Sequence, residues 1–482
     1  MAERGRVQAP ARGGRHVNRN ALVRAGVLVV LGLVLPGLAC KSARDVVIVC
    51  EDTAQLIRGF GTALNHWDPE VHALYRSPEF AKRYVHELGV SLIRIPLHPA
   101  VLREAIADPE AIRRQDFAHR SRYVAPVLDF VQSAMAQDPD IGVIATVWTP
   151  PGWMKTNRAE KGGGQLRADR REHFARYLVE WVRLLEEQYD ITLRGLSIQN
   201  EPHFTQDFES CTYTPEAYRE TLQVVGRTFD EAGVDVPLIG PEDMTHALAR
   251  TRSYVDSALT TPEGQRRLRA IATHGLWSDA GPEERSPFFA MGELARDLGL
   301  ELWLTETSGD TVVGRDGKVA LLDTLALGLH RALTAGGVSA WLYWQVSAGD
   351  GGEAQALMDG AEPSFKYAVM RHWSGFVRPG ARRVGVQPEP AGLEVSAFHR
   401  PESSELSIVA LNRNASPERL SLRIDCREAA SSLPLHLHQT TPDQTVERLL
   451  GVGNPRNTIG LVLPPHSLTT LHRGPLRPRA MR

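Results

Sequence analysis

Residues 171–201 read REHFARYLVEWVRLLEEQYDITLRGLSIQNE, and this stretch joins a helical pattern to a strand pattern. Within Arg171–Gln188 the apolar residues recur three and four positions apart, which is the spacing of one face of a helix. Leu193–Glu201 is instead a short, mainly apolar run that Pro202 ends. A helix that passes at once into an apolar strand predicts a parallel βα unit.

The same unit repeats along the chain. A second helix is expected over Thr214–Ala232, where Thr214 is a good N-cap and Pro215 suits the first helical position. The eight strand candidates are Gly59–Leu64, Leu92–Leu97, Ile141–Trp148, Leu193–Glu201, Val236–Glu242, Ile271–Leu276, Glu301–Thr307 and Ser339–Val346. Their alternation with helices over residues 59–377 predicts an α/β fold, a (β/α)8 TIM barrel. A doubly wound sheet also alternates, but Gly59-Phe60-Gly61 lacks the third glycine of a dinucleotide-binding turn, and no cofactor is expected.

Residues 378–482 have a different character, with short alternating strands in place of helices. The strand candidates are Leu393–His399, Glu405–Asn412, Leu420–Ile424 and Leu433–Gln439. They predict a small β-sandwich side domain, to which the extended residues 41–58 are expected to add strands. All nine tryptophans fall between Trp67 and Trp373, and no tyrosine follows Tyr367. The side domain is therefore expected to support the barrel structurally rather than to bind polysaccharide through aromatic platforms.

Residues 1–40 have the pattern of a bacterial export signal. An arginine-rich stretch leads into the apolar run Ala25–Leu35, and small residues follow. The apolar run is shorter than the roughly 20 residues that span a bilayer. Cys40 after Leu38-Ala39 indicates a lipoprotein signal with an acylated cysteine, but Gly37 stands where leucine is usual, and simple cleavage is the alternative. We expect the protein to be secreted or attached to the cell envelope, with membrane contact only through a lipid at Cys40.

Charge and cysteine content exclude some functions. The 55 basic and 57 acidic side chains nearly cancel, so nothing favours nucleic acid or anionic lipid as a partner, and a neutral substrate fits better. Besides Cys40 the chain has Cys50, Cys211 and Cys426, which allow one disulfide whose pairing the sequence does not choose. Their spacing matches no cysteine metal site.

Chemistry-bearing residues fall near the ends of the predicted strands, which in a barrel meet at one face. Asn200 and Glu201 end strand four, and Glu306 lies at the end of strand seven in Leu302–Thr307. Strand alternation is expected to turn Leu302, Leu304 and Glu306 to one side. The strand ends together hold Arg94, Trp148, Asn200, Glu201, His274, Glu306 and Trp344. Two carboxyl groups are what the cleavage of a glycosidic bond requires, and tryptophan faces suit sugar rings.

Each of these residue types also has an ordinary structural use. A glutamate at a strand end can be an ion-pair partner, and a lone histidine or tryptophan can serve packing. A metal-dependent barrel hydrolase would carry a His-x-His near strand one, where His66 is isolated. His436 and His438 lie in the side domain and are expected at its surface. The sequence contains no Gly-x-Ser-x-Gly motif, so nothing in it indicates a serine hydrolase.

Over residues 55 to 470 the sequence resembles glycoside hydrolase family 30. The resemblance rests on Gly59-Phe60-Gly61, Leu92-Ile93-Arg94, the stretch Trp148–Lys155 (WTPPGWMK), the stretch Ile198–Pro202 (IQNEP), Thr305-Glu306, the stretch Trp341–Gln345 (WLYWQ) and the stretch Trp373–Gly380 (WSGFVRPG). It implies a retaining glycoside hydrolase that cleaves β-linked sugars without a metal.

The resemblance also implies residue roles. Glu201 would be the general acid/base and Glu306 the nucleophile, with Asn200 binding the hydroxyl next to the reacting carbon. Arg94 would keep Glu306 ionised, because a nearby cation favours the charged carboxylate. Trp148, His274 and Trp344 would line the sugar site.

The sequence leaves the sugar, endo or exo cleavage, and the oligomeric state open. The acidic, glycine-rich stretch Ser347–Glu353 disfavours a glucuronic acid branch. The alternative function is a carbohydrate-binding barrel of the cell envelope without catalysis.

Overall fold

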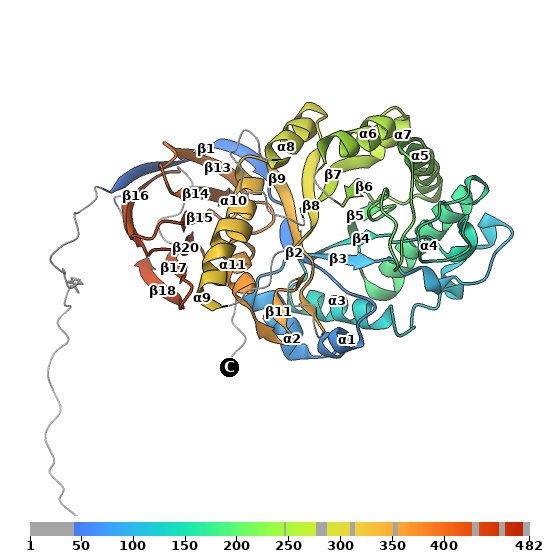
Figure 1. Cartoon of the computed structure of the whole chain (residues 1–482), viewed down its shortest axis with the longest axis horizontal. Helices are drawn as coiled ribbons and strands as arrows, with labels where there is room; N and C mark the ends of the chain where they lie inside the picture. The colour runs from blue at the N-terminus through green and yellow to red at the C-terminus, as the bar shows by residue number, and fades with distance from the viewer. Residues whose placement is uncertain are drawn as a thin grey trace, which may run out of the picture. The chain divides into compact units, whose positions relative to one another are not determined.

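The computed structural model describes residues 43–244, 247–275, 287–308, 314–349, 355–426, 433–452 and 458–475 (Figure 1). These residues belong to one compact unit, Ser42–Arg482. The expected export signal and Cys40 lie outside the described residues. In the part of the chain that is described, no helix is long and apolar enough to cross a membrane.

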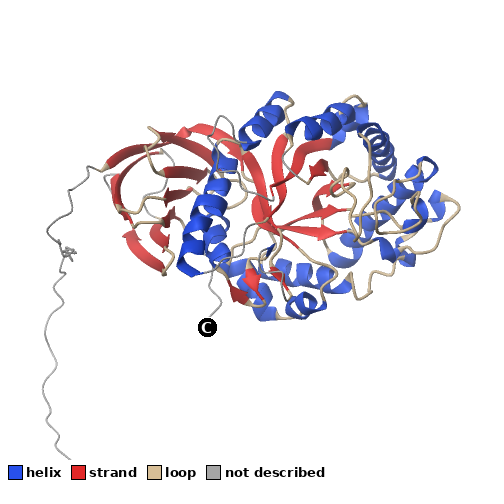
Figure 2. Cartoon of the chain, viewed as in Figure 1, coloured by secondary structure: helices blue, strands red, loops and turns tan. Residues whose placement is uncertain are grey.

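Eight parallel strands close into a barrel, with β2 pairing both β3 and β9. The strands are β2 (Gly59–Ala63), β3 (Leu92–Pro96), β4 (Gly142–Thr146), β5 (Leu193–Ser197), β6 (Leu238–Asp243), β7 (Leu268–Gly275), β8 (Glu301–Thr307) and β9 (Val338–Tyr343). Figure 2 shows the helices arranged around these strands. The α-helices are α1 (Pro69–Tyr75), α2 (Pro78–Lys82), α3 (Ala125–Gln137), α4 (Arg171–Tyr189), α5 (Pro215–Ala232), α6 (Leu248–Ala258), α7 (Pro262–Arg267), α8 (Pro287–Asp297), α9 (Gly314–Leu321), α10 (Leu327–Thr334) and α11 (Phe365–Ser374). The predicted barrel is confirmed.

Local sequence explains where α5 begins and ends. The side chain of Thr214 accepts a hydrogen bond from the backbone N–H of Ala217 at 3.2 Å, and Pro215 follows at the first helical position. At the other end Gly233 has a φ of 68°, a left-handed conformation that glycine adopts without steric cost. The helix thus occupies the predicted range.

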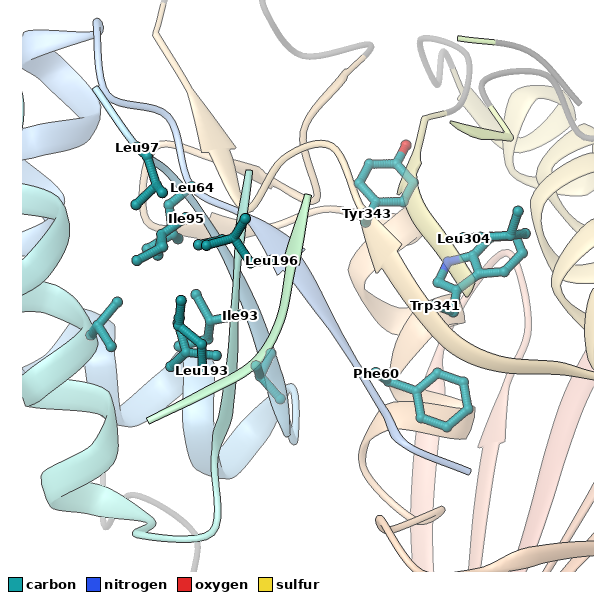
Figure 3. Packing of buried hydrophobic residues seen from close by; sticks show 14 of the residues in the cluster. Phe60, Leu64, Ile93, Ile95, Leu97, Leu193, Leu196, Leu304, Trp341 and Tyr343 are labelled. Atoms are coloured by element: carbon teal, nitrogen blue, oxygen red, sulfur yellow. The ribbon is translucent and has the colours of Figure 1, made fainter. Parts of the chain in front are cut away.

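The barrel strands separate two apolar layers. A small inner cluster consists of Leu92, Ile144, Ile239, Ala270, Ala272, Trp303, Ala340 and Leu342. A much larger outer cluster packs the other faces of the strands against the helices and includes the residues labelled in Figure 3.

The expected alternation along β8 is wrong. Leu302 and Leu304 belong to the outer cluster, whereas Trp303 belongs to the inner one. The pairing of β8 with β7 shifts by one residue between Leu304 and Glu306, because Thr273 pairs Leu304 but His274 pairs Glu306. This irregularity, rather than regular alternation, accounts for the Glu306 carboxylate reaching the barrel interior.

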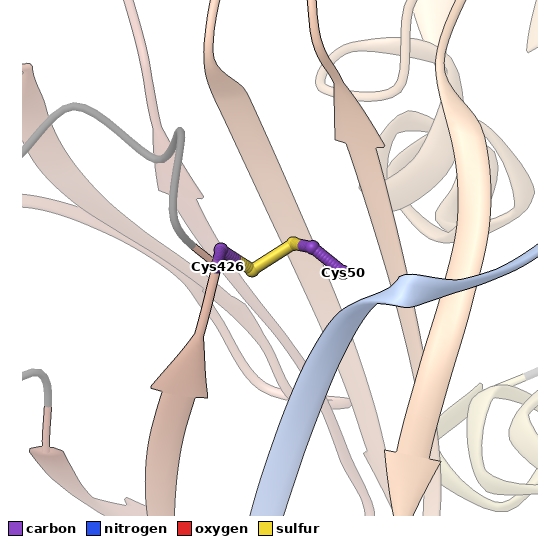
Figure 4. Close-up of a disulfide and its surroundings, with 2 residues drawn as sticks. All are labelled: Cys50 and Cys426. Carbon is purple, nitrogen blue, oxygen red and sulfur yellow. A yellow bond between two sulfur atoms is a disulfide. The ribbon is translucent and has the colours of Figure 1, made fainter.

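A nine-stranded sheet forms the side domain, in the order β18-β17-β20-β15-β14-β13-β1-β16-β19. Its strands are β1 (Arg44–Leu56), β13 (Arg382–Gln387), β14 (Glu394–Arg400), β15 (Glu405–Asn412), β16 (Glu418–Asp425), β17 (Pro434–Thr440), β18 (Thr445–Val452), β19 (Thr458–Leu463) and β20 (Ser467–Arg473). β1 lies inside this sheet, antiparallel to β13 and parallel to β16. A disulfide joins Cys50 at β1 to Cys426 after β16, across 376 residues (Figure 4). The third cysteine among the described residues, Cys211, is free and buried.

Histidines lie where α11 meets the side sheet. Nδ1 of His372 lies 2.8 Å from the hydroxyl of Thr470, and its ring centroid is 4.6 Å from that of His438. His438 is only 1% exposed, so the expectation that it lies at the surface is wrong. The helix packs over it and shields that side of β17.

Candidate active site

The two glutamates and His274 lie together at the end of the barrel where the strands finish. One carboxylate oxygen of Glu201, one of Glu306 and a ring nitrogen of His274 all lie within 4.8 Å of one another. Nδ1 of His274 is 3.1 Å from Oε1 of Glu201, and its Nε2 is 3.8 Å from Oε2 of Glu306. A separation this short resembles a retaining pair, at about 5–5.5 Å, more than an inverting pair, at about 6.5–9.5 Å.

Arg94 connects the predicted polar residues. Its Nη1 donates to Oε2 of Glu306 at 2.8 Å, and its Nη2 donates to Oδ1 of Asn200 at 2.6 Å. The guanidinium also lies 4.4 Å from the ring centroid of Trp148, whose ring is 6.0 Å from that of Trp344. The structure therefore brings all the predicted site residues together, and all are buried: Arg94, Trp148, Asn200, Glu201, His274, Glu306 and Trp344.

A third carboxylate, which was not predicted from the sequence, lies against Arg94. Glu242, in β6, is 0% exposed and places Oε1 3.2 Å from Nε of Arg94. The rule that pointed to the other strand ends would have found it, because Glu242 and Asp243 end the fifth barrel strand. Arg94 thus stands between two buried carboxylates.

The backbone at Glu201 and Glu242 is unusual. Their φ angles are 48° and 58°, and a left-handed conformation outside glycine costs on the order of 1–3 kcal/mol. The backbone N–H of Glu201 donates to the carbonyl of Glu242 at 3.0 Å. This bond joins the two turns, and the strain they carry is typical of a functional site.

Burial and charge shift the ionisation of the site. Burial raises the pKa of Glu306, and His274 and Arg94 oppose this without cancelling it. Arg94 lies beside Glu306 as expected and favours the ionised carboxylate, but desolvation outweighs this effect, so the net shift of the Glu306 pKa is upward. Burial lowers the pKa of His274, but Glu306 and Glu201 raise it by more than burial lowers it, so the net shift is upward. For Glu242 burial acts upward, and Arg94 and His274 bring the pKa below its usual value.

A loop after β5 covers Glu201. The side-chain amide of Gln206 donates to Oε2 of Glu201, the oxygen that His274 does not contact. No pattern in the sequence marks Gln206, because the loop has neither helical nor strand periodicity. Both oxygens of Glu201 therefore have partners before a substrate arrives.

Exposed aromatic rings border the site. Trp67 is 40% exposed, and Phe204 and Phe208, from the same loop as Gln206, are 39% and 42% exposed. The Trp67 ring lies 5.5 Å from that of Trp344 and 6.4 Å from that of Phe208. Beside them is a cavity of about 610 Å³, lined by Asn65, Trp67, Asp68, Pro69, Glu70, Trp344, Gln345, Ala348, Gly349 and Gln355.

Among the described residues, two groups of side chains are close enough to hold a metal ion. One is the pair of glutamates with His274, and the other is His66, His98 and Glu209. His66 is isolated in the sequence but not in the fold. The charge of Arg94 beside the first group makes a cation there unfavourable, since like charges repel at short range.

A (β/α)8 barrel with two adjacent carboxylates at the ends of its fourth and seventh strands is an arrangement that glycoside hydrolases use. The family model described as the glycosyl hydrolase family 30 TIM-barrel domain matches residues 59–285. The model of the glycosyl hydrolase family 30 beta sandwich domain matches residues 380–471. The chain belongs to glycosyl hydrolase family 30.

Individual relatives are distant. The lysosomal acid glucosylceramidase of Mus musculus is 23% identical over 410 residues, which cover 77% of this chain and 78% of that protein. A Caenorhabditis elegans relative is 24% identical over 355 residues, and the chain spans only 65% of its length. The crystal structure of a family 30 subfamily 8 xylanase from Clostridium acetobutylicum superposes with a TM-score of 0.70 at 22% identity, covering 89% of this chain and 100% of the xylanase. At this identity the structural likeness concerns the fold.

Proposed function

We propose that this protein is a retaining glycoside hydrolase that cleaves β-linked sugars by double displacement, with Glu306 as nucleophile and Glu201 as acid/base. The observation that carries the proposal is the close approach of the two carboxylates, within 4.8 Å, at the strand ends of the barrel. An inverting enzyme needs room for a water molecule between its carboxylates, and this spacing disfavours that.

The surroundings of the pair fit these roles. The Arg94 guanidinium and the His274 ring both approach Oε2 of Glu306, so Oε1 is left to attack the anomeric carbon. Glu201 gives its proton to the leaving oxygen as the bond to the sugar breaks, and a glycosyl ester forms on Glu306. Glu201 then takes a proton from water, which attacks the same carbon and releases Glu306. Two inversions return the sugar to its starting configuration.

The test is sugar release from a panel of β-linked polysaccharides and aryl β-glycosides by the wild type and by Glu306→Gln. The expected result is cleavage by the wild type only, with NMR showing the β-anomer as the first product. Glu263→Gln, a carboxylate outside the site, is the matched control and should keep full activity. Release of the α-anomer would contradict the retaining mechanism. Binding of a polysaccharide without cleavage by any variant would favour the non-catalytic carbohydrate-binding alternative.

The panel should include glycosides with apolar leaving groups. Trp67, Phe204 and Phe208 expose apolar rings at the border of the site, and the two phenylalanines belong to the loop that follows Glu201. Such rings can pack against a sugar face or against an aliphatic chain. The mouse relative's name, a glucosylceramidase, makes β-glucosides with lipid-like aglycones a reasonable first choice.

We also propose that the protein is exported. The disulfide between Cys50 and Cys426 supports this, because such bonds persist mainly in oxidising compartments. Cell fractionation and mass spectrometry of the mature N-terminus test the proposal, and palmitate labelling that depends on Cys40 would identify a lipoprotein. A cytoplasmic protein with an intact N-terminus would contradict it.

A further inference from the structure

The group His66, His98 and Glu209 lies one aromatic ring away from the catalytic pair. His66 follows β2, His98 follows β3 and Glu209 lies in the loop after β5, so three separate barrel loops build it. The His66 ring is 6.2 Å from that of Trp148, which in turn contacts Arg94. No step of the proposed reaction uses these three side chains.

The buried His66 ring lacks hydrogen-bond partners among the described residues. Its side chain is 1% exposed, and neither ring nitrogen has a hydrogen-bond partner among the described residues. A neutral imidazole has one N–H to donate and one lone pair to accept. Leaving such groups unsatisfied in a protein interior is costly, so a buried histidine of this kind indicates a bound molecule or ion.

Two kinds of ligand could meet this need, and His98 discriminates between them. Nδ1 of His98 accepts the backbone N–H of Ala100 at 3.1 Å, so in the neutral ring the proton lies on Nε2. Burial lowers the pKa of His98 to about 4 and that of His66 well below its usual value, so both rings are neutral near pH 7. Nδ1 is then occupied and Nε2 has no lone pair, which leaves His98 unable to coordinate a metal but able to donate a hydrogen bond.

The spacing of the group suits a hydroxyl. A nitrogen of His66, a nitrogen of His98 and a carboxylate oxygen of Glu209 all lie within 4.8 Å of one another. A single oxygen can therefore reach all three at about 2.8 Å, an ordinary hydrogen-bond length. A hydroxyl can donate to the Glu209 carboxylate while its two lone pairs accept from the two imidazoles.

We propose that His66, His98 and Glu209 form a recognition site for one hydroxyl group of the sugar that lies against Trp148 and Trp67. The inference rests on the proposed function for its ligand class, a carbohydrate. The Trp67 ring, 4.7 Å from His66 and partly exposed, provides an apolar face for the same sugar. The three side chains select for the orientation of that hydroxyl, so they discriminate between epimeric sugars.

Binding, rather than cleavage, tests this site. The probes are the methyl β-glycosides of glucose, galactose, xylose and fucose, and the readout is tryptophan fluorescence in the Glu306→Gln background, where no probe is consumed. His66→Phe keeps the ring packing and removes both nitrogens, and it should weaken the best probe by tenfold or more. His66→Asn keeps one donor and one acceptor and should recover part of the affinity. His119→Phe, a histidine that contacts Tyr189 instead, is the control and should bind as the parent does.

Three results would overturn the proposal. The first is unchanged affinity of the best probe in His66→Phe, and the second is binding of none of the four probes. The third is stoichiometric binding of Zn²⁺ that His66→Phe abolishes, which would make the group a metal site. Binding is measured without hydrolysis. If the proposed reaction is wrong but the hydroxyl site exists, the probes still bind and His66→Phe still weakens that binding.

Discussion

Replacement of Arg94 by glutamine removes the one cation that separates two buried carboxylates. Arg94 is 0% exposed, and its guanidinium lies 2.8 Å from Glu306 and 3.2 Å from Glu242. Breaking a buried ion pair by removing one partner costs about 3–5 kcal/mol. Whole-domain stabilities are about 5–15 kcal/mol, so Arg94→Gln alone is expected to fold poorly. Arg94→Gln/Glu242→Gln removes one charge of each sign and is the variant to assay.

The effect on the nucleophile follows from the charge it loses. Two unit charges about 4 Å apart interact by about 4 kcal/mol at an effective dielectric constant near 20. Because about 1.4 kcal/mol is a factor of ten, kcat/KM near pH 6 should fall by up to about 1000-fold in the double variant. In the double variant the loss of Arg94 raises the pKa of Glu306 and the loss of the Glu242 charge lowers it; because Arg94 acts on Glu306 more strongly than Glu242 does, the net shift is upward. The acid limb of the pH–rate profile should therefore move to higher pH, with part of the activity returning as the pH rises.

The assay is kcat/KM from about pH 4.5 to 9 on an aryl glycoside that the wild type cleaves, with thermal unfolding as the check on folding. Arg120→Gln is the matched control, because Arg120 and Asp129 form an exposed ion pair that should contribute little. A folded double variant with activity within about tenfold of the wild type at pH 6 would refute the reasoning. So would an acid limb that does not move.

Three further predictions concern the side domain. Cys50→Ser/Cys426→Ser should lower the free energy of unfolding by about 2–5 kcal/mol, and an unchanged denaturation midpoint would contradict this. Burial lowers the pKa of His472 to about 4, so the folded protein keeps this ring neutral while the unfolded chain takes up a proton below about pH 6.5. The contribution of His472 to the free energy of unfolding is therefore complete above about pH 6.5 and decreases towards pH 4. Between pH 6.5 and 5 this amounts to about 2 kcal/mol, which His472→Gln should largely remove in urea unfolding, and an equal loss in both proteins would rule out the assignment. Alanine at exposed Leu449, Leu450 and Val462 should leave binding to insoluble polysaccharide unchanged, and a large loss would show that the sheet binds substrate.

Local features of the sequence predicted the barrel well. Apolar runs of strand length alternate with helical segments, and caps such as Thr214 mark where helices begin, so each βα unit can be recognised from its own residues. The pairing of Cys50 with Cys426 could not be predicted, because it depends on which strands become neighbours in the side sheet. That neighbourhood is set by contacts between distant segments, which periodicity does not report.

The sequence predicted only residues of the candidate site that lie at the ends of barrel strands, and none of those that lie in loops. The predicted residues lie together, but Glu306 reaches the site because the pairing of β8 with β7 shifts by one residue. The spacing of residues along the sequence does not predict that shift. Its ionisation depends on the depth of burial, which the sequence does not give, and not only on Arg94. Gln206 and the group around His66 arise from long loops folding over the barrel end, and loops of this kind lack a periodic signal.

The place of β1 bears on how the chain is made. This strand leaves the ribosome early, yet its neighbours β13 and β16 come near the end of synthesis, and its cysteine bonds a partner 376 residues later. At about 5–20 residues per second, β1 waits on the order of tens of seconds before its sheet can exist. Until then its backbone is an open edge on which other nascent chains could pair. A chain held extended until translation is complete, and folded afterwards in one step, avoids that interval. A fragment that begins at the first barrel strand would lack β1, and β13 and β16 would then lose the strand that lies between them.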